Sequence, residues 1–433
     1  MHSVSINPWA AKCWALDRYR WRLLRQHHGL PGSCLRLLRA ALVDFAFGVR
    51  ARWRLASASD GQSCDFLLLQ AAPKVIRLQR KKMLIEGVRA RGFSLVETAL
   101  PEPGEILRQR QLRKPPYPVP TRYFGMAAYA EWLAEHYRPR ILLNDRNGSL
   151  YVPFLRLALN ARGALLVHLA HATTVEGSRR LGMNDYDYYF LFGQSSIEAL
   201  RQRPLRFGHS HAVLSGSHMV DLAYDMPPAE PAARTLLVLG VGPDKEKERG
   251  YLATYALLKE WASGHPDYRV LIKAHPRSQA TFWQQAAAEL PNLQVLPSGC
   301  SLAEALRQAS VVVNIMSNAV IEAALAHRPV IYVNVAGTQD IFEQERFLGA
   351  RVSDLHALSE RVAAIAGNYS AYVERSVAFA EHHLSHGCKG LSNTLDLLQQ
   401  LLAGMRPESI LLPASPPDLG GPYRDGAVGP LLS

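Results

Sequence analysis

The sequence of 433 residues has few cysteines, and they form no pattern. The five cysteines lie far apart, without the Cys-x-x-Cys spacing of a zinc site or redox pair, which favours reduced thiols over a disulfide framework. No uninterrupted apolar run reaches the roughly 18 residues of a membrane-spanning helix, and the first residues lack the pattern of a secretory signal. We therefore expect a cytoplasmic protein.

The length and composition indicate a globular protein with more than one core. An apolar fraction of 48% is ordinary for such proteins and excludes a disordered chain. A chain of 433 residues exceeds what one hydrophobic core usually supports. The sequence therefore predicts two domains.

Positive charge is in excess and is concentrated near the N-terminus. The net charge is +12, and nine arginines stand against two aspartates between Asp17 and Leu55. Arginines interleaved with aromatic and aliphatic residues are typical of helices that lie on an anionic membrane surface. The alternative is a helical layer with a solvated basic face. Nucleic acid is not expected as a partner, because no recognised binding motif accompanies the charge.

The first half of the chain alternates short apolar runs with amphipathic stretches, as strands and helices do. A basic helix is expected over 74–91, and the proline-rich segment 114–123 is expected to be a loop. The expected strands are 64–70, 93–100, 141–144, 164–171, 186–193 and 211–217.

A second alternation follows the Pro- and Ala-rich segment 222–234, with strands expected at 235–242, 268–275, 293–297, 311–316 and 329–335. Such alternation is typical of parallel sheets covered by helices. We predict an α/β fold with two Rossmann-like domains that face a cleft, preceded by a helical extension. The predicted ranges are 1–60 for a basic helical extension, 61–225 for an N-terminal acceptor domain, 226–412 for a C-terminal nucleotide-donor domain and 413–433 for a disordered tail.

Ligands of such folds bind at the carboxyl ends of strands, so polar residues just after strands are candidates for a site. Lys273, His275 and Arg277 follow one strand, and three cations within five residues can cradle a phosphate. The alternative is a solvated turn before a helix. Gly242 belongs to a glycine-rich turn, half of a dinucleotide fingerprint, that lets a ligand approach the backbone.

Another candidate group follows the strand expected at 311–316. Ser317 and Asn318 begin a helix whose first N–H groups can hold a phosphate, unless Ser317 only caps that helix. Glu322 lies one turn further, where a carboxylate can accept hydrogen bonds from ribose hydroxyls.

The first half offers two candidate bases at strand ends. Alternation along the strand at 164–171 puts one of His168 and His171 inside the domain and the other at the mouth. His171 is the better candidate for the cleft, where a histidine acts as a general base near neutral pH. Asp145 follows the strand at 141–144. The alternative for His171 is a hydrogen-bonded structural histidine, and the alternative for Asp145 is a simple turn.

The order of these motifs resembles that of GT-B glycosyltransferases of surface-polysaccharide synthesis. These include capsule-type Kdo and sialic acid transferases and CDP-glycerol glycerophosphotransferases. The likeness covers about residues 140–345 and rests on motif order more than on identity. Ala172 departs from the glycine that usually follows the histidine, and the serine-rich loop is reduced to Ser317 and Asn318. The matching strings are HATT (171–174), NDYDYYFLFG (184–193), SGSHMVD (215–221), KAHPRS (273–278) and SNAVIEAALAHRPVIYV (317–333).

The resemblance implies a nucleotide-sugar donor held mainly by the C-terminal domain. His275, Ser317 and Asn318 would contact phosphate, and Glu322 the ribose or sugar. A glycan or glycolipid acceptor would enter from the N-terminal domain, where His171 or Asp145 would take the hydroxyl proton.

No Asp-x-Asp motif stands in a suitable loop, so we expect no metal and no cofactor beside the donor. His382 and His386 share a helix face, but no third ligand follows at a zinc-site spacing.

The expected function is transfer of a sugar from CMP-Kdo or a CMP-nonulosonate to a surface polysaccharide or lipopolysaccharide. The alternatives are a UDP-sugar transferase, a CDP-glycerol-type phosphotransferase, a UDP-sugar 2-epimerase and a non-catalytic membrane-associated protein. Peripheral contact with the inner membrane would follow from the basic N-terminus.

Overall fold

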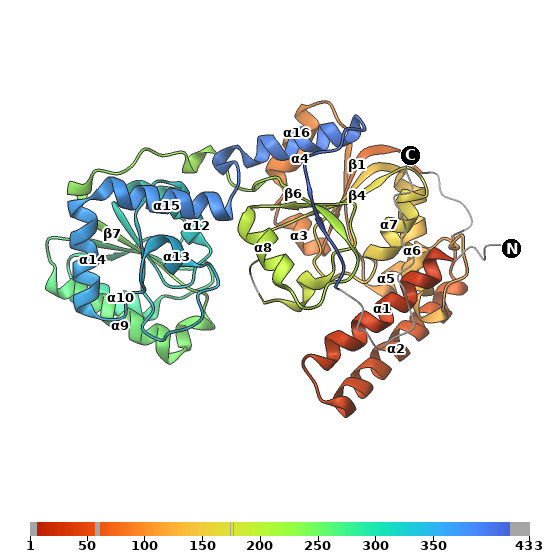
Figure 1. The fold of residues 1–433 in the computed structure, drawn as a ribbon, viewed down its shortest axis with the longest axis horizontal. Helices are drawn as coiled ribbons and strands as arrows, with labels where there is room; N and C mark the ends of the chain where they lie inside the picture. The colour runs from red at the N-terminus through yellow and green to blue at the C-terminus, as the bar shows by residue number, and fades with distance from the viewer. Residues whose placement is uncertain (1–6, 57–60, 174, 176, 416–433) are drawn as a thin grey trace.

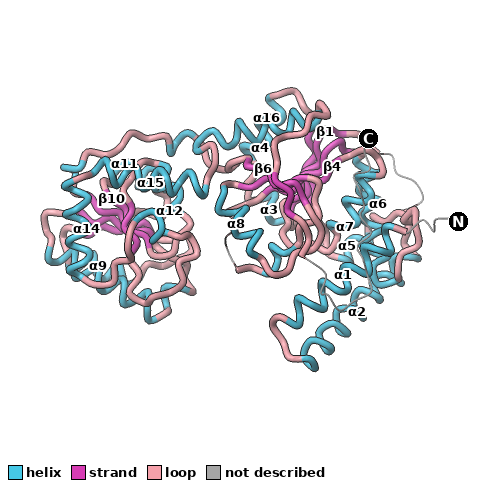
Figure 2. Tube along the Cα trace, viewed as in Figure 1, coloured by secondary structure: helices cyan, strands magenta, loops and turns pink. Residues whose placement is uncertain are grey.

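The computed structural model describes residues 7–56, 61–173, 175 and 177–415. It has two lobes, each with a sheet at its centre and helices around it (Figures 1 and 2). The tail predicted at 413–433 lies outside the described residues from residue 416 onward.

The N-terminal lobe contains a seven-stranded sheet of order β12-β6-β5-β4-β3-β1-β2. It is parallel except for β12, which pairs antiparallel with β6. Leu67, Leu68 and Leu69 are successive buried residues of β1, as expected of a strand covered on both faces. The strand order changes direction between β1 and β3. The strands are β1 (Cys64–Gln70), β2 (Leu95–Ala99), β3 (Pro139–Asn144), β4 (Leu165–Leu169), β5 (Tyr188–Leu191), β6 (Ser210–Leu214) and β12 (Ile410–Leu412).

The C-terminal lobe contains a five-stranded parallel sheet of order β11-β10-β7-β8-β9. Counted in chain order from its far edge, this is 3-2-1-4-5, the order of a Rossmann half, and it changes direction between β7 and β10. The prediction of two Rossmann-like domains is confirmed. The strands are β7 (Thr235–Leu239), β8 (Arg269–Lys273), β9 (Leu293–Val295), β10 (Val311–Asn314) and β11 (Val330–Tyr332).

Helices connect and cover the strands of both lobes. Among the described residues, none is long and apolar enough to cross a bilayer. The first lobe has α1 (Pro8–Arg25), α2 (Leu30–Arg52), α3 (Pro73–Arg77), α4 (Lys82–Ala90), α5 (Pro103–Arg108), α6 (Thr121–Tyr137), α7 (Val152–Asn160) and α8 (Gln194–Gln202). After these come α9 (Arg249–Gly264), α10 (Thr281–Glu289), α11 (Leu302–Gln308), α12 (Ala319–Leu325), α13 (Gln344–Leu348), α14 (Leu355–Gly367), α15 (Tyr369–His383) and α16 (Gly390–Leu402).

The single helix predicted over 74–91 is wrong, because the chain breaks between α3 and α4. Gln79 has φ 48°, a left-handed backbone conformation that no helix interior accommodates. The four residues of the break end at Lys81, whose side chain is 2% exposed although charged neighbours on both sides reach solvent. The break thus turns one lysine of a basic run inward.

The N-terminal helices are part of the first lobe rather than an appended layer. Trp9, Cys13 and Leu16 of α1 are buried in the main hydrophobic core, and the ring of Trp9 stacks on Phe154. Helix α2 crosses α6 closely at Gly48, where an added Cβ would stand 1.7 Å from the carbonyl oxygen of Thr121. A side chain at this position would force the two helices apart.

The chain returns to the first lobe at its C-terminal end. Helix α16 contributes Leu395 and Leu398 to the core on one face of the N-terminal sheet, and β12 extends that sheet. The predicted range 226–412 for the second domain is therefore wrong after α15, because these apolar residues are buried against β1 and α4 rather than against the second sheet.

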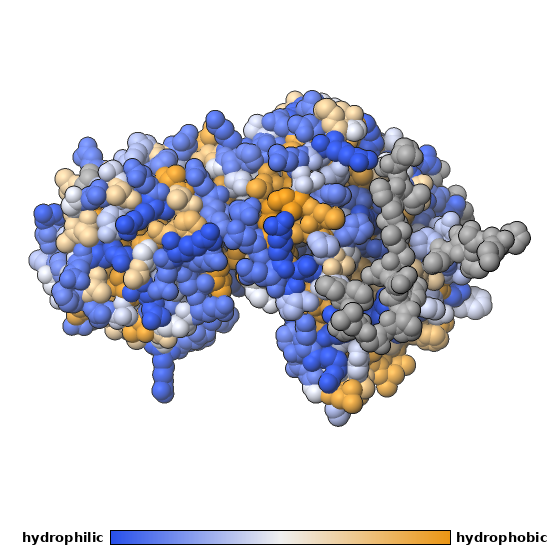
Figure 3. Space-filling model, in the orientation of Figure 1, coloured by the Kyte–Doolittle hydropathy of each residue, from blue (hydrophilic) through white to orange (hydrophobic). Residues whose placement is uncertain are grey.

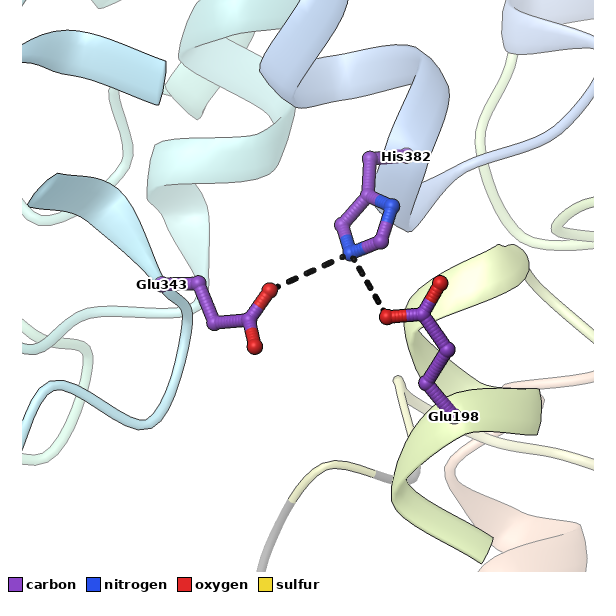
Figure 4. A group of neighbouring side chains, drawn as sticks. All are labelled: Glu198, Glu343 and His382. Carbon is purple, nitrogen blue, oxygen red and sulfur yellow. Dashed lines mark ion pairs between the residues drawn. The ribbon is translucent and has the colours of Figure 1, made fainter. Parts of the chain in front are cut away.

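The two lobes touch where α8 of the first meets α15 of the second. The His383 ring lies 2.8 Å from Ser195 Oγ through Nδ1 and 2.8 Å from the Phe342 carbonyl through Nε2. Beside it, His382 Nε2 lies 3.5 Å from a carboxylate oxygen of Glu343 and 4.0 Å from one of Glu198 (Figure 4). Side chains from both lobes therefore form one hydrogen-bonded contact.

Candidate functional site

Each sheet presents one point at which ligands of doubly wound folds bind, the crevice where the strand order changes direction. In the first lobe this point lies after β1 and β3, and in the second after β7 and β10. Asp145 directly follows β3, Gly240 follows β7, and Ser317 comes three residues after β10. Candidates from both halves of the sequence therefore stand at direction-change points.

Asp145 joins the two strands at the first point and faces a buried lysine. Its Oδ1 accepts a hydrogen bond from the backbone N–H of Ala71 at 3.0 Å, which connects the ends of β3 and β1. Its Oδ2 lies 3.9 Å from Nζ of Lys81. Asp145 therefore does more than form a turn: its buried carboxylate also contacts a buried lysine.

Lys81 is the centre of this cluster and was missed by the sequence analysis. Its Nζ lies 2.6 Å from Nε2 of His218, which follows β6 and is itself 2% exposed. Burial lowers the pKa of Lys81 to about 8, although the Asp145 carboxylate opposes that change. Burial, then the charge of Lys81, holds the pKa of His218 well below its usual range. We therefore expect His218 to be neutral and to accept the lysine's hydrogen bond.

Of the two histidines on β4 and just after it, one is buried and the other is exposed, as the alternation predicted. His168 is buried, and its ring stacks on Tyr186 with centroids 4.3 Å apart. His171 is exposed, and its Nε2 lies 3.2 Å from Nδ2 of Asn147. The same Asn147 places Oδ1 2.7 Å from Nε2 of His168. One asparagine therefore positions the outer histidine against the inner one.

His171 has the protonation state that a base requires. Partial burial of its ring, then the positive charge of Lys81, lowers its pKa from the usual 6.5, and Asp145 acts in the opposite direction. The imidazole is neutral at pH 7 and can accept a proton. Thr174, the last residue of the HATT string, lies outside the described residues.

The second lobe offers a glycine turn next to the turn after β8. A Cβ added at Gly240 would stand 2.9 Å from the backbone nitrogen of His275, whereas one added at Gly242 would meet nothing within 4 Å. His275 Nδ1 accepts a hydrogen bond from the Arg277 backbone N–H at 3.2 Å. This contact orients the His275 ring, while Lys273 is half-buried and the Arg277 side chain is exposed.

The segment after β10 carries a buried carboxyl. The Ser317 hydroxyl accepts from the Ala319 backbone N–H at 3.4 Å, as a weak cap of α12, while its own N–H donates to Oδ1 of Asn314 at 3.0 Å. Oε2 of Glu322 is shielded from solvent and has no hydrogen-bond partner among the described residues. Burial raises the pKa of Glu322 to about 7. A neutral Glu322 can donate a hydrogen bond as well as accept one.

Some of the predicted residues lie near one another in the structure. Asp145 and His171 share one cluster through Lys81 and Asn147, and His275 lies against the turn that contains Gly240. Helix α12, which carries Glu322, packs against the segment between the lobes at Leu222–Tyr224. Burial, then the charge of Glu322, raises the pKa of Tyr224. Nothing in the sequence separates Lys81 from Lys82, whereas His218 follows a strand end and was open to the rule used for His171.

Among the described residues, Glu198, Glu343 and His382 form a group whose arrangement permits a metal ion, with ligand atoms within 4.8 Å of one another. Arg346 already supplies a cation there, since its Nη1 lies 2.8 Å from Glu343 and 3.6 Å from Glu198. This group therefore acts as an ion-pair network at the contact between the lobes.

Comparison with known proteins bears on the fold. No protein-family model matches the sequence, and no curated protein matches it. A protein from Listeria monocytogenes assigned as a UDP-N-acetylglucosamine 2-epimerase has a similar structure. The TM-score is 0.51 at 10% identity over 79% of this chain and 98% of that one.

Two further solved structures score lower. MurG from Acinetobacter baumannii gives a TM-score of 0.46 at 14% identity over 78% of this chain and 99% of that one. The wall teichoic acid polymerase TagF gives 0.42 at 11% identity over 85% and 98%. The chain has the fold of two Rossmann-like domains of the GT-B type.

Proposed function

We propose that this protein is a glycosyltransferase that moves a sugar from a nucleotide-activated donor to an acceptor hydroxyl. The observation that carries the proposal is the pair of unlike polar clusters at the two direction-change points. The first combines a buried lysine, a carboxylate and a neutral histidine. The second lobe has a glycine turn beside His275, and Ser317 and Glu322 follow β10 in the same sheet. A substrate bound between the lobes would contact both.

The second lobe is proposed to hold the donor nucleotide. Gly242 leaves room for a phosphate against the backbone. Lys273 and Arg277 supply positive charge, and His275 supplies a ring N–H donor. Ser317 and Asn318 offer further hydrogen bonds. The partnerless oxygen of Glu322 suits a ribose or sugar hydroxyl, which would satisfy it.

The first lobe is proposed to hold the acceptor and the base. His171 is exposed and neutral at pH 7, so it is the proposed base. Asp145 already binds the Ala71 N–H and faces Lys81, and is proposed to position the cluster. Lys81 and His218 hold Asp145 in place from the buried side.

The reaction follows from these roles. The acceptor oxygen forms a bond to the anomeric carbon, and its proton passes to His171. The bond between that carbon and the phosphate oxygen breaks, and the nucleotide leaves with the electron pair. Positive charge from Lys273 and Arg277 stabilises the departing phosphate without reorganisation, and the His275 ring N–H donates a hydrogen bond to it. The proposal needs no metal ion.

The proposed donor is CMP-Kdo or a CMP-nonulosonate, because one histidine-proline turn and a short serine loop suit a single phosphate. The test is a thermal-shift screen against CMP, CDP, UDP and UMP. A nucleotide present at about 100 times its Kd stabilises the fold by about 2.7 kcal/mol. We expect CMP to raise Tm most. A response to UDP or CDP instead would move the proposal to a UDP-sugar or CDP-glycerol donor, and no response from any of them would contradict it.

The alternative of a 2-epimerase makes a different product. A transferase releases free nucleotide only when an acceptor is present or by slow hydrolysis, and leaves the configuration at C2 unchanged. An epimerase inverts C2 of UDP-N-acetylglucosamine without any acceptor. Incubating the protein with UDP-N-acetylglucosamine alone and following C2 by nuclear magnetic resonance distinguishes the two functions.

The proposed acceptor is a surface polysaccharide or lipopolysaccharide intermediate on the cytoplasmic side of the inner membrane. The basic N-terminal region supports this placement.

A further inference from the structure

Helix α2 carries a row of exposed apolar side chains along its outer face. Leu35, Leu38, Leu42, Phe45 and Val49 follow one another at spacings of three and four residues, so they share one side of the helix. Leu35 is 69% exposed and Leu42 61% exposed, and Trp53 at the C-cap is 85% exposed. Isolated exposed leucines are normal, but a continuous row marks an interaction surface.

The opposite side of α2 is already used for packing. Phe47 and Ala51 are buried in the core of the first lobe, and Gly48 lies against α6. Helix α2 therefore packs against the lobe through its opposite side, and the exposed row takes no part in that packing. The α1–α2 hairpin projects from the lobe, and apolar side chains gather at its lower end (Figures 1 and 3).

Positive charge accompanies the row, and negative charge does not. Arg36, Arg39, Arg50 and Arg54 are exposed on or just after the same helix. Between residues 7 and 56 the acidic residues are Asp17 and Asp44. Asp17 is paired with Arg122, and Asp44 with Arg20 at 2.7 Å. Among the described residues 7–56, the surface thus combines apolar side chains with an excess of positive charge.

We propose that this face of α2 lies on an anionic phospholipid bilayer, with the apolar row in the interface and the arginines at lipid phosphates. The combination fits a bilayer, since apolar burial and attraction to anionic lipids act together. A second copy of the chain fits less well, because two α2 helices would bring their arginines together without acidic partners. The proposal stands independently of the transferase function.

The placement has a consequence for the cleft. A notch between the two lobes opens on the side to which the hairpin projects (Figure 3). A chain that rests on a bilayer through α2 would turn that opening toward the lipid. If the transferase proposal holds, an acceptor with a lipid anchor could reach the site without leaving the membrane.

The test is flotation of the full chain with vesicles of phosphatidylcholine plus phosphatidylglycerol, compared with phosphatidylcholine alone. Deleting α1 and α2 would open the core, so point variants are used. Leu38→Glu with Leu42→Glu should weaken binding to anionic vesicles by about tenfold or more. Arg36→Glu with Arg39→Glu should act in the same direction, more strongly at low salt. Met405→Glu is the matched control, because Met405 is 55% exposed on another part of the surface.

The expected result is binding to anionic vesicles, little binding to neutral vesicles and loss in both double variants, with Tm unchanged. Equal binding by the leucine variant and the wild type would overturn the proposal. Light scattering without vesicles tests the other occupant. A wild-type dimer that becomes a monomer in the leucine variant would also overturn the proposal, because a second copy would then cover this face.

Discussion

The two direction-change points differ in how many of their polar groups already have partners within the protein. At the first, Lys81, Asp145 and His218 are buried, and Lys81 contacts both of the others. At the second, Gly242 faces open space and Oε2 of Glu322 has no partner among the described residues. Oε1 of Gln70 at the end of β1 also lacks a partner among the described residues, so the contrast concerns the ionisable groups: those of the first point contact one another, whereas the Glu322 carboxyl has an oxygen without a partner. Under our proposal, this is the difference between a catalytic cluster and a donor site that the ligand completes.

The strongest test of this contrast is His171→Ala. Removal of a general base typically costs about 10²–10⁴-fold in kcat, and KM for the donor should change little. In the wild type, the acid limb of the kcat profile should lie below the usual histidine pKa of 6.5, because burial and Lys81 lower the pKa of His171. Steady-state kinetics against pH measures both. Unchanged kcat in the variant would remove His171 from catalysis.

A second test concerns the stability of the buried cluster. Lys81→Met should destabilise the first lobe by about 2–4 kcal/mol, because it leaves the Asp145 carboxylate buried beside an apolar chain. Lys82→Met is the control, since the Lys82 side chain is 62% exposed, and it should change stability by less than about 0.5 kcal/mol. Urea unfolding measures both.

The same experiment can show whether the two charged groups are coupled. Lys81→Met combined with Asp145→Asn should cost less than the sum of the single changes, because neither buried charge is then left alone. Strictly additive losses would mean that Lys81 and Asp145 do not stabilise each other.

The smallest expected effect is a pH dependence at the second point. Burial raises the pKa of Glu322 from 4.5 to about 7, so the folded protein holds a proton that the unfolded chain releases. The free energy of unfolding should therefore fall as the pH rises from about 4.5 to about 7. Glu322→Gln should remove about 2–3 kcal/mol of this fall. Unfolding at pH 5 and pH 8 measures it, and an identical slope in variant and wild type would contradict the buried state of the carboxyl.

Much of the fold could be predicted from the sequence, because parallel strands covered on both faces are continuous apolar runs. On this basis we predicted β10 from the run VVVNI and β3 from the run ILLN. Strand β12 was missed, since Ile410–Leu412 is a short run close to a proline-rich tail and acquires its partner only by returning to β6. The domain limit after α15 was missed for the same reason. Long-range pairing leaves no local signal.

The site was predictable where it follows strand ends and unpredictable where it depends on a backbone break. The strand-end rule proposed His171, Asp145 and His275, which stay predictions as site residues. Lys81 was not, because the sequence around it predicts a continuous helix and the left-handed Gln79 interrupts that helix only in the folded chain. Burial then selects Lys81 from a run of exposed basic residues.

The most direct test of the central claim is a calorimetric titration of nucleotide into the wild type, His275→Ala and His171→Ala. The claim is that the second lobe holds the donor while the first supplies the base. We predict that CMP binds the wild type and His171→Ala equally, and that His275→Ala binds about tenfold more weakly, the loss of one charge-assisted hydrogen bond. Equal binding by His275→Ala, weakened binding by His171→Ala, or no nucleotide binding by the wild type would contradict the account.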